Sequence, residues 1–323
     1  MPQPVYPGYF ADPFVWEHEG VYYAVGTGEE EATGEHPGRS HVTPLLRSHD
    51  LRSWEYVQHA LLHPGADLGE QFWAPEVALG DDGLFYMYYS VGLYEKGTDH
   101  HLRVAIGESP EGPYEDSGKA LLMPSAEENF VFDPNPFRDE DGQWYLFYNR
   151  NHLEPGEDEE GIAHAGDTIS CRRMLSMARL DDDPIVILRP RHDWQRSPRR
   201  GEGEHAGIDW HTTEGACIVK REGRYWCFYS GAAWFTDRYG VDYCSSDSVR
   251  GRYRAHYSPE DVPPRVLRAG ERGLRGPGHN SLVVGPDGRD YIVFHAWNAE
   301  LTKRQMHILP LRWNGGPEVV WED

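Results

Sequence analysis

Five short segments of the chain share one pattern of polar and apolar positions. In each segment an acidic residue and a glycine end a polar turn, and a run of aromatic and β-branched residues follows. Glycine adopts the positive φ that a tight turn between two strands requires, and aromatic and β-branched side chains favour the pleated strand. The pattern predicts five β-hairpins with the turn glycines Gly20, Gly83, Gly142, Gly223 and Gly288.

The spacing of these hairpins predicts the architecture. The turn glycines are about 60 to 80 residues apart, helical periodicity is scarce, and polar loops at 48–54, 109–114 and 246–253 precede further strands. Such strand repeats are typical of a β-propeller with four strands per blade. We therefore expect an all-β, five-bladed β-propeller that forms a single domain over residues 1–323; an antiparallel sandwich is the alternative. Loops at 151–168 and 189–205, expected between strands of the third blade, account for the longest interval.

Ionisable residues occur at nearly the same offset, seven to nine residues, before every turn glycine. The first strand of a propeller blade lines the central channel, so these side chains would meet at one end of the axis, each on the innermost strand of a different sheet. Crowded carboxyl groups repel one another, and folding alone does not call for them, so the set indicates a functional site. Its members are Asp12, Glu76, Asp133, Glu214 and His279.

Converging carboxyl groups suit the cleavage of a glycosidic bond. One carboxylic acid protonates the leaving oxygen, while a carboxylate activates water or attacks the sugar carbon. Aromatic rings near the site could stack on the apolar face of a sugar. For Phe14 and Trp16, packing between blades is an equally good interpretation. The rings are Phe14, Trp16, Trp73, Trp234 and Trp297.

Charge and composition exclude several other classes of protein. The formal net charge of −22 repels phosphate backbones, which argues against a nucleic-acid partner. No apolar run approaches the length of a membrane span, and the N-terminus lacks the basic start and apolar stretch of a secretory signal. The four cysteines show no CxxC spacing and are expected to be reduced thiols, not a zinc site. We therefore expect a cytoplasmic protein without a membrane partner.

The motifs around the acids resemble those of glycoside hydrolase family 43, the five-bladed propellers that include arabinofuranosidases, xylosidases and arabinanases. The resemblance extends over nearly the whole chain, and its strength lies in the order of several weak motifs. These are Ala11-Asp12-Pro13, Trp73-Ala74-Pro75-Glu76, Phe132-Asp133-Pro134, Glu214-Gly215 and Gly276-Pro277-Gly278-His279-Asn280-Ser281.

The resemblance implies a role for each matching residue. Asp12 would be the general base that deprotonates water, and Glu214 the general acid. Asp133 would orient Glu214 and raise its pKa by like-charge repulsion. His279 would lie near a calcium or other ion in the channel, and no organic cofactor is expected. The residues expected to bind substrate are Trp73, Glu76, Phe14, Trp234 and Arg304.

We expect an inverting, exo-acting α-L-arabinofuranosidase that cleaves small arabinose-containing oligosaccharides, with Asp12 and Glu214 about 6.5–9.5 Å apart. A β-xylosidase or an arabinanase of the same family is an alternative. A retaining fructan-cleaving propeller would carry Asn before its first acid, where this chain has Ala11. A sugar-binding propeller without catalysis is the third alternative. Two departures from the family pattern, no proline after Glu214-Gly215 and the presence of Asn135-Pro136, are expected to alter the shape of the subsite and not its chemistry.

Overall fold

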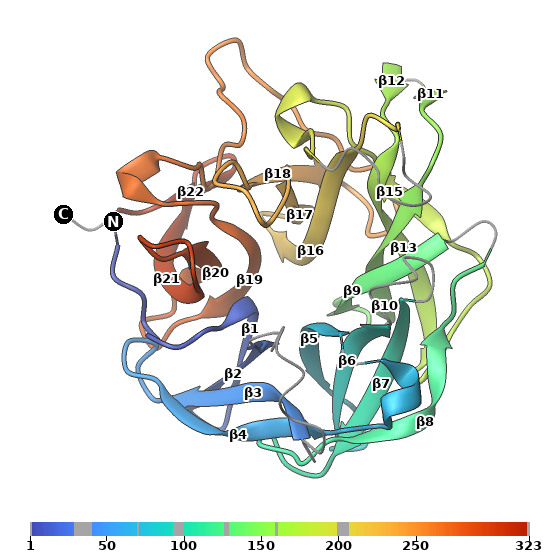
Figure 1. Ribbon diagram of the computed structural model, residues 1–323, viewed down its shortest axis with the longest axis vertical. Helices are drawn as coiled ribbons and strands as arrows, with labels where there is room; N and C mark the ends of the chain where they lie inside the picture. The colour runs from blue at the N-terminus through green and yellow to red at the C-terminus, as the bar shows by residue number, and fades with distance from the viewer. Residues whose placement is uncertain are drawn as a thin grey trace.

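Antiparallel sheets surround a common axis in the computed structural model, which describes residues 2–28, 41–69, 71–92, 100–125, 129–158, 161–198 and 207–321 (Figure 1). Three of the five blades are four-stranded sheets in which the strands follow one another in chain order. Blade 1 consists of β1 (Ala11–His18), β2 (Val21–Thr27), β3 (His41–Ser48) and β4 (Glu55–Leu62); blade 2 of β5 (Gln71–Leu79), β6 (Phe85–Gly92), β7 (His101–Gly107) and β8 (Glu115–Leu122); and blade 5 of β19 (Gly278–Val284), β20 (Asp290–Trp297), β21 (Arg304–Trp313) and β22 (Pro317–Val319).

Blades 3 and 4 carry the insertions. The described residues of the segment 151–168 form a small hairpin and the start of β13 within blade 3, as expected. Residues 189–198 follow β15, the last strand of blade 3, and so do not lie between strands of that blade, while 199–205 lie outside the described residues. Blade 3 consists of β9 (Asn129–Arg138), β10 (Trp144–His152), β13 (Gly166–Ser176), β14 (Arg179–Leu180) and β15 (Ile185–Leu188), with the hairpin β11 (Gly156–Asp158) and β12 (Gly161–Ala163); blade 4 consists of β16 (His211–Arg221), β17 (Arg224–Gly231) and β18 (Gly240–Ser246). The other elements are the short 3-10 turns η1 (Ala66–Leu68), η3 (Asp193–Gln195) and η5 (Glu271–Gly273).

A short parallel pairing joins these two blades. Gly166 pairs with His211 at the start of β13 and β16, so the strands of blades 3 and 4 form one hydrogen-bonded sheet. The prediction that no two site residues share a sheet is therefore wrong for Asp133 and Glu214, although they lie on different inner strands, β9 and β16. The close approach depends on glycine, since a Cβ on Gly166 would lie 1.7 Å from the carbonyl oxygen of His211.

The predicted hairpins are confirmed between the first and second strand of every blade. All five turn glycines adopt left-handed backbone, with φ between 75° and 85°, which glycine reaches without strain. The inner strand of each blade therefore runs from the channel end to one of these turns.

The hydrophobic core consists of five clusters, one between each pair of neighbouring blades. Successive residues of a strand point to opposite faces, so Tyr23 packs toward blade 2 while Tyr22 packs toward blade 5. Phe14 and Trp16 stack on each other and pack beside the cluster between blades 1 and 2. The aromatic alternation of the hairpins thus serves packing between blades.

The N-terminal segment closes the ring of blades. The backbone N–H groups of Val5 and Phe10 donate to the carbonyl oxygens of Met306 and Arg304 on β21 of blade 5, each at 2.9 Å. This pairing brings the start of β1, and with it Asp12, beside β21. Among the described helices, none has the length and apolar character needed to cross a membrane.

Candidate active site

Five left-handed residues, one on each inner strand, lie near the strand start where the pairing with the second strand shifts register, and β9 has a further one at Phe130 (φ 50°). Four of these five residues are not glycine, and left-handed backbone costs a non-glycine residue roughly 1–2 kcal/mol. Strain of this kind concentrates at functional sites. The five residues and their φ values are Asp12 (48°), Ala74 (45°), Asp133 (51°), Gly215 (61°) and His279 (45°).

This structural equivalence refines the register expected from the sequence. Asp12, Asp133 and His279 occupy equivalent positions, but Glu214 precedes the left-handed position of its strand by one residue, and Glu76 follows its own by two. The difference arises at the register shift between the first and second strands. A count of residues back to the turn glycine does not reveal it, because the count takes no account of that shift. Glu76 therefore lies farther along its strand, toward the turn, than the other acids lie along theirs.

Asp12 is buried and is held by charge and hydrogen bonds. Thr27 Oγ1 donates to Asp12 Oδ2 at 2.6 Å, and Arg304 Nη1 donates to Oδ1 at 3.2 Å. Burial by itself would raise the pKa of Asp12, but the positive charge of Arg304 outweighs it and holds the pKa well below the usual value. Asp12 is therefore a carboxylate at neutral pH, the form that a general base requires.

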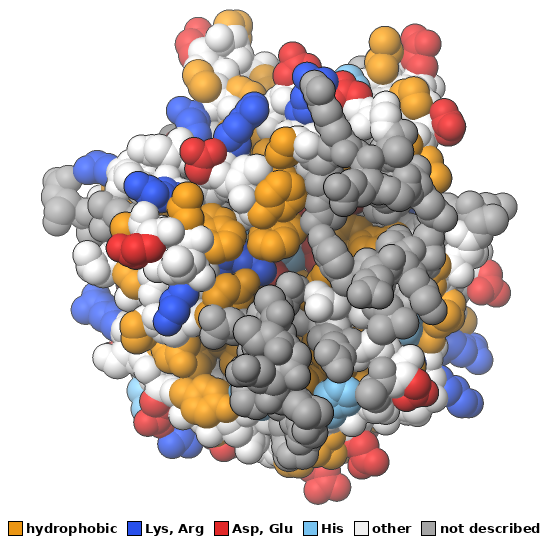
Figure 2. Space-filling model, in the orientation of Figure 1, with side chains coloured by type: hydrophobic (Ala, Val, Ile, Leu, Met, Phe, Trp, Pro, Cys, Tyr) orange, Lys and Arg blue, Asp and Glu red, His pale blue; other side chains and the backbone are white. Residues whose placement is uncertain are grey.

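Aromatic rings hold the guanidinium of Arg304 beside Asp12. Arg304 is buried, its Nε donates to the Tyr9 hydroxyl at 3.0 Å, and its guanidinium carbon lies 4.4 Å from the centre of the Trp234 ring. Trp297 Nε1 donates to the backbone oxygen of Trp234 at 2.9 Å. Figure 2 shows hydrophobic side chains bordering the central opening on this side of the ring, over β19–β21.

Glu214 and Asp133 lie on the inner strands of neighbouring blades and share contacts. The Tyr239 hydroxyl donates to Glu214 Oε1 at 2.7 Å. The N–H of Gly215, the next residue along β16, lies 3.2 Å from both Asp133 Oδ2 and Asn149 Oδ1. These bonds fix the acid of β16 against the acid of β9.

Burial and repulsion from neighbouring acids shift the pKa of Asp133. Burial, followed by the charges of Glu214, Asp12 and Asp167, raises the pKa of Asp133 well above its usual value. The repulsion between two carboxylates is mutual, so the Asp133–Glu214 pair keeps a proton at pH values where an isolated carboxyl group would have lost it. The pair can therefore supply a proton while Asp12 accepts one.

His279 lies between the two aspartates. Its Nδ1 is 3.5 Å from Asp12 Oδ1 and 3.8 Å from Asp133 Oδ2, and its backbone N–H donates to Ser230 Oγ at 2.7 Å. Burial lowers the pKa of His279, so the imidazole is neutral near pH 7. A Cβ on Gly215 would lie 3.1 Å from two atoms of this ring. The structure thus brings together Asp12, Asp133, Glu214, His279 and Arg304.

These groups do not form an oxygen cage for calcium. Asp12 is already engaged with Arg304 and Thr27, and calcium takes six to eight oxygen ligands. Within the described residues, the one grouping of three side chains with donor atoms close enough for a shared metal lies elsewhere, at His164, Asp193 and His211. There the two imidazoles stack 3.9 Å apart and nearly parallel, so their lone pairs do not converge on one ion. A channel ion at His279 stays a prediction.

The remaining predicted residues lie at different depths. Trp73 stacks on His100 at 3.9 Å and precedes Ala74, whose N–H donates at 2.9 Å to the Thr27 hydroxyl that in turn donates to Asp12. Glu76 is buried below the site and accepts from Asn135 Nδ2 at 2.7 Å. Burial raises the pKa of Glu76 well above its usual value. The substrate-binding roles of Trp73, Glu76, Phe14, Trp234 and Arg304 stay predictions.

Several residues of the site were not predicted. Thr27 ends β2, Tyr239 precedes β18, and His295 is on β20, so none of them belongs to an inner strand. Their only local signal is position, because each lies at the channel end of a second strand or just before a third strand. Asp167, which accepts from Trp210 Nε1 and Thr212 Oγ1, lies at the start of β13 for a similar reason.

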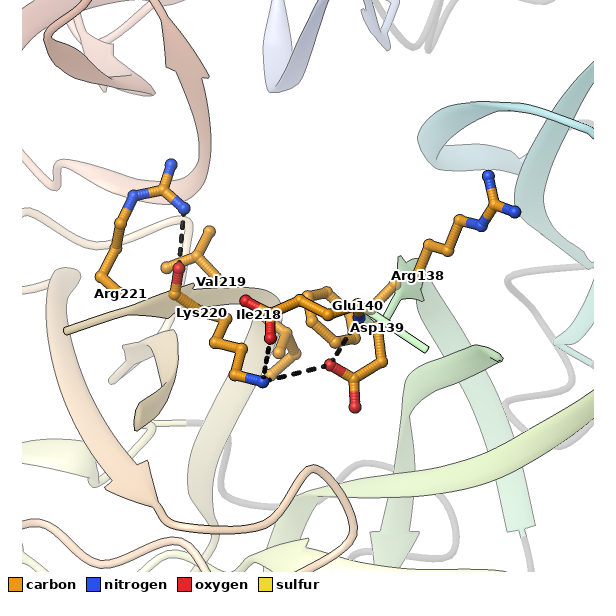
Figure 3. A pocket seen from close by; sticks show the side chains of 8 residues that line it. Arg138, Asp139, Glu140, Ile218, Val219, Lys220 and Arg221 are labelled. Carbon is orange, nitrogen blue, oxygen red and sulfur yellow. Dashed lines mark hydrogen bonds and ion pairs between the residues drawn. The ribbon is translucent and has the colours of Figure 1, made fainter. Parts of the chain in front are cut away.

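The opposite end of the inner strands holds a different pocket. Figure 3 shows that it is lined by the turn ends of β9 and β16, residues 137–140 and 218–221. Lys220 Nζ donates there to Glu140 Oε2 at 2.7 Å and lies 3.7 Å from Asp139 Oδ1. Every carboxylate there faces a cation or a hydroxyl, which leaves none poised for acid–base chemistry. The acids of the candidate site lie at the other end of the same strands.

Comparison with known proteins gives the family. The model of glycosyl hydrolases family 43 matches residues 1–317, so the chain belongs to that family and is a glycoside hydrolase. This confirms the family predicted from the ordered motifs.

Individual relatives are distant. A β-D-galactofuranosidase of Aspergillus niger is 24% identical over 94% of this chain and 79% of its own length. An extracellular exo-α-(1→5)-L-arabinofuranosidase of Streptomyces chartreusis is 27% identical over 88% of this chain and 79% of its own length. The crystal structure of a thermostable family-43 glycoside hydrolase superposes with a TM-score of 0.77 at 24% identity, covering 99% of this chain and 96% of that one. The propeller fold is confirmed, and the substrate is open.

Proposed function

We propose that this glycoside hydrolase is an inverting, exo-acting α-L-arabinofuranosidase that cleaves small arabinose-containing oligosaccharides. The observation that carries the proposal is that the pKa of Asp12 and the pKa of Asp133 are shifted in opposite directions. The charge of Arg304 keeps Asp12 ionised, while burial and repulsion from Glu214 raise the pKa of Asp133. A pair of carboxyl groups whose environments push their pKa values apart supplies one base and one acid.

The proposed reaction is a single displacement. Asp12 removes a proton from a water molecule while the oxygen of that water attacks the anomeric carbon. The bond from this carbon to the glycosidic oxygen breaks. Glu214 gives its proton to the leaving oxygen. The products are a sugar of inverted configuration and a free alcohol, while Asp12 is protonated and Glu214 ionised until solvent restores them. Asp133 orients Glu214 through the Gly215 backbone and keeps the pair protonated.

The sugar is the finer part of the proposal. Both relatives described above are named for furanosides, L-arabinofuranose in one and D-galactofuranose in the other. Arg304, packed on Trp234, presents a flat cationic and aromatic wall beside Asp12. Such a wall suits a small furanose ring with exposed hydroxyl groups. These features favour arabinofuranose over xylopyranose.

The test compares substrates and follows the product by NMR. The 4-nitrophenyl glycosides of α-L-arabinofuranose, β-D-xylopyranose and β-D-galactofuranose are assayed with arabino-oligosaccharides, and we expect the first to give the highest kcat/KM. The first anomer released should have inverted configuration, as an Asp12–Glu214 separation of about 6.5–9.5 Å requires. A retained anomer would contradict inversion, and a preference for xyloside would contradict the sugar. Binding of oligosaccharides without any hydrolysis would support a non-catalytic propeller.

A further inference from the structure

The side chain of His295, on β20, accepts a hydrogen bond from the backbone of Asp12, the proposed general base. The imidazole is 0% exposed, and the N–H of Asp12 donates to its Nδ1 at 3.0 Å. Because this N–H points at the nitrogen, Nδ1 must carry the lone pair, and the ring proton is on Nε2. Asp12 Oδ1 lies 3.2 Å from the same Nδ1 and therefore receives no proton from it.

This bond compensates for an irregularity of β1. The pairing of β1 with β2 shifts register between Ala11 and Phe14, and Asp12 between them has the left-handed φ of 48°. His295 supplies an acceptor for the buried N–H of Asp12, although its own Nε2 has no hydrogen-bond partner among the described residues. The bond therefore fixes the position of the Asp12 backbone, and with it the direction of the carboxylate toward Arg304 and Thr27.

The same ring lies beside Tyr239, which is hydrogen-bonded to Glu214, the proposed general acid. The rings of His295 and Tyr239 are nearly parallel, 11° apart, with centroids separated by 5.8 Å. Tyr239 is fully buried and donates to Glu214. Gly278 makes room for it, since a Cβ there would lie 1.9 Å from the tyrosine ring. A single imidazole thus touches the backbone of the base and the ring that holds the acid.

We propose that His295 is a positioning residue that sets the base and the acid relative to each other, with its unprotonated Nδ1 as the acceptor for the Asp12 N–H. The inference rests on the proposed function for the roles of Asp12 and Glu214. It goes beyond that function by naming the group that fixes their geometry, and His295 itself transfers no proton.

Two variants test the proposal on the active enzyme. His295→Leu removes the acceptor and should lower kcat about 100-fold, since a displacement near 1 Å at a reacting group costs about that much. KM should change little, because His295 does not touch the substrate. His295→Asn places an amide oxygen near the position of Nδ1 and should recover at least about tenfold of the loss. Equal activity of the leucine variant and the wild type, or no recovery with asparagine, would overturn the proposal.

His307 provides a matched control in the same blade. It is 1% exposed, lies on the neighbouring strand β21 and stacks on Phe294 at 5.5 Å, away from Asp12. His307→Leu should cost stability, as His295→Leu does, yet leave kcat near the wild-type value. A similar loss of kcat in both variants would mean that burial of any histidine in blade 5 matters, and the positioning role would be wrong.

One measurement does not depend on catalysis. ¹⁵N NMR of the wild-type protein reports which imidazole nitrogen of His295 carries the proton. We expect Nε2 to carry it and Nδ1 to be bare, together with slow hydrogen exchange at the Asp12 amide. A proton on Nδ1 would overturn the inference even if the chain hydrolysed no glycoside. If NMR shows the expected tautomer but no glycoside is hydrolysed, the proposed function is contradicted and the inference about His295 is not. The NMR measurement also tests the inference if His295→Leu does not fold.

Discussion

The two ends of the inner strands adopt similar backbone conformations with very different residues. At the turn end, the turn glycine of each hairpin is left-handed in all five blades, and in blades 1 and 4 the acidic residue before it, Glu19 or Glu222, is left-handed as well. At the channel end, the left-handed position is glycine only in blade 4, and it is occupied by Asp12 in blade 1 and His279 in blade 5. Charged groups also differ, because Asp139 and Glu140 at the turn end face Lys220 (Figure 3). Asp133 at the channel end faces other acids.

The difference separates what the fold needs from what the chemistry needs. A hairpin needs only a residue that reaches positive φ cheaply, and glycine meets that need. The channel end keeps side chains at strained positions, which folding alone would disfavour. Residues there are held by contacts from other blades, such as the bond from Arg304 to Asp12. Variants at the two ends should therefore have different effects on activity and on stability.

Removal of the carboxyl groups proposed as base and acid should have the largest effect. Asp12→Asn should lower kcat by about 10²–10⁴, the usual contribution of a general base, while the fold stays intact. Glu214→Gln should lose as much on oligosaccharides but recover with a dinitrophenyl leaving group, which departs without a proton. Steady-state kinetics on both substrates, with circular dichroism of each variant, measure this difference.

The turn end supplies the control for these variants. Lys220→Met changes a charged residue on the same strand as Glu214, at its other end, and should leave kcat near the wild-type value. Equal rescue of Asp12→Asn and Glu214→Gln by the better leaving group would reverse or void the assignment of base and acid.

Arg304→Met should change the pH dependence of catalysis. Burial raises the pKa of Asp12 and Arg304 opposes it, so loss of the guanidinium raises that pKa and leaves less of the base ionised at low pH. The acidic limb of kcat/KM against pH should move to higher pH, with a loss of about tenfold or more at pH 5 that shrinks as the pH rises.

A neighbouring variant separates charge from packing. Tyr9→Phe removes the hydrogen bond to Arg304 Nε but keeps the ion pair with Asp12. Its acidic limb should match that of the wild type. If Arg304→Met lowers activity equally at every pH, the residue acts on substrate binding and does not control the ionisation of Asp12.

Local sequence is enough to predict the hairpins but only part of the site. Turn glycines and aromatic alternation act within a few residues, so five blades could be predicted from them. Asp12 and Asp133 were predictable because each precedes a proline at the start of a strand. The contact between Arg304 and Asp12 joins residues nearly 300 positions apart, and it exists only because the N-terminal segment closes the ring along β21.

The register of the site was harder to predict for a physical reason. A left-handed aspartate or alanine has no sequence signature, because its conformation is imposed by neighbouring blades. The bulge therefore moved Glu214 and Glu76 away from positions equivalent to Asp12. Prediction of Thr27 and His295 fails in the same way, since both belong to second strands that resemble ordinary core strands.

Matched glycine variants on one strand give a sharper comparison of the two ends. Gly215 and Gly223 both have positive φ, so alanine at either position should cost about 1 kcal/mol of unfolding free energy. A Cβ at Gly223 meets nothing within 4 Å, whereas at Gly215 it lies 3.1 Å from His279. Gly215→Ala must displace the imidazole and should lower kcat about tenfold, while Gly223→Ala should keep it. Equal kcat in the two variants, measured beside urea unfolding, would contradict the division between the ends.

The smallest expected effect concerns Glu76, which lies between the two ends in the middle of β5. Burial raises its pKa well above the usual value, and the structure gives it Asn135 as a hydrogen-bond partner. In the folded protein it therefore stays protonated over a pH range in which the unfolded chain has released the proton. The folded state then binds more protons than the unfolded state, so the stability that this group confers falls as the pH rises through that range.

Glu76→Gln should remove this pH dependence. Glutamine resembles the protonated acid in size and can accept the same hydrogen bond from Asn135, but it does not titrate. Near pH 4, where the wild-type carboxyl group is mostly protonated in both states, the two proteins should have similar unfolding free energies. At higher pH the variant should become the more stable of the two, by about 1.4 kcal/mol for each unit by which the folded pKa exceeds the unfolded value. Urea unfolding at pH 4, 6 and 8 measures the difference in unfolding free energy between the two proteins. If that difference stays constant or changes sign with rising pH, Glu76 is ionised in the folded channel.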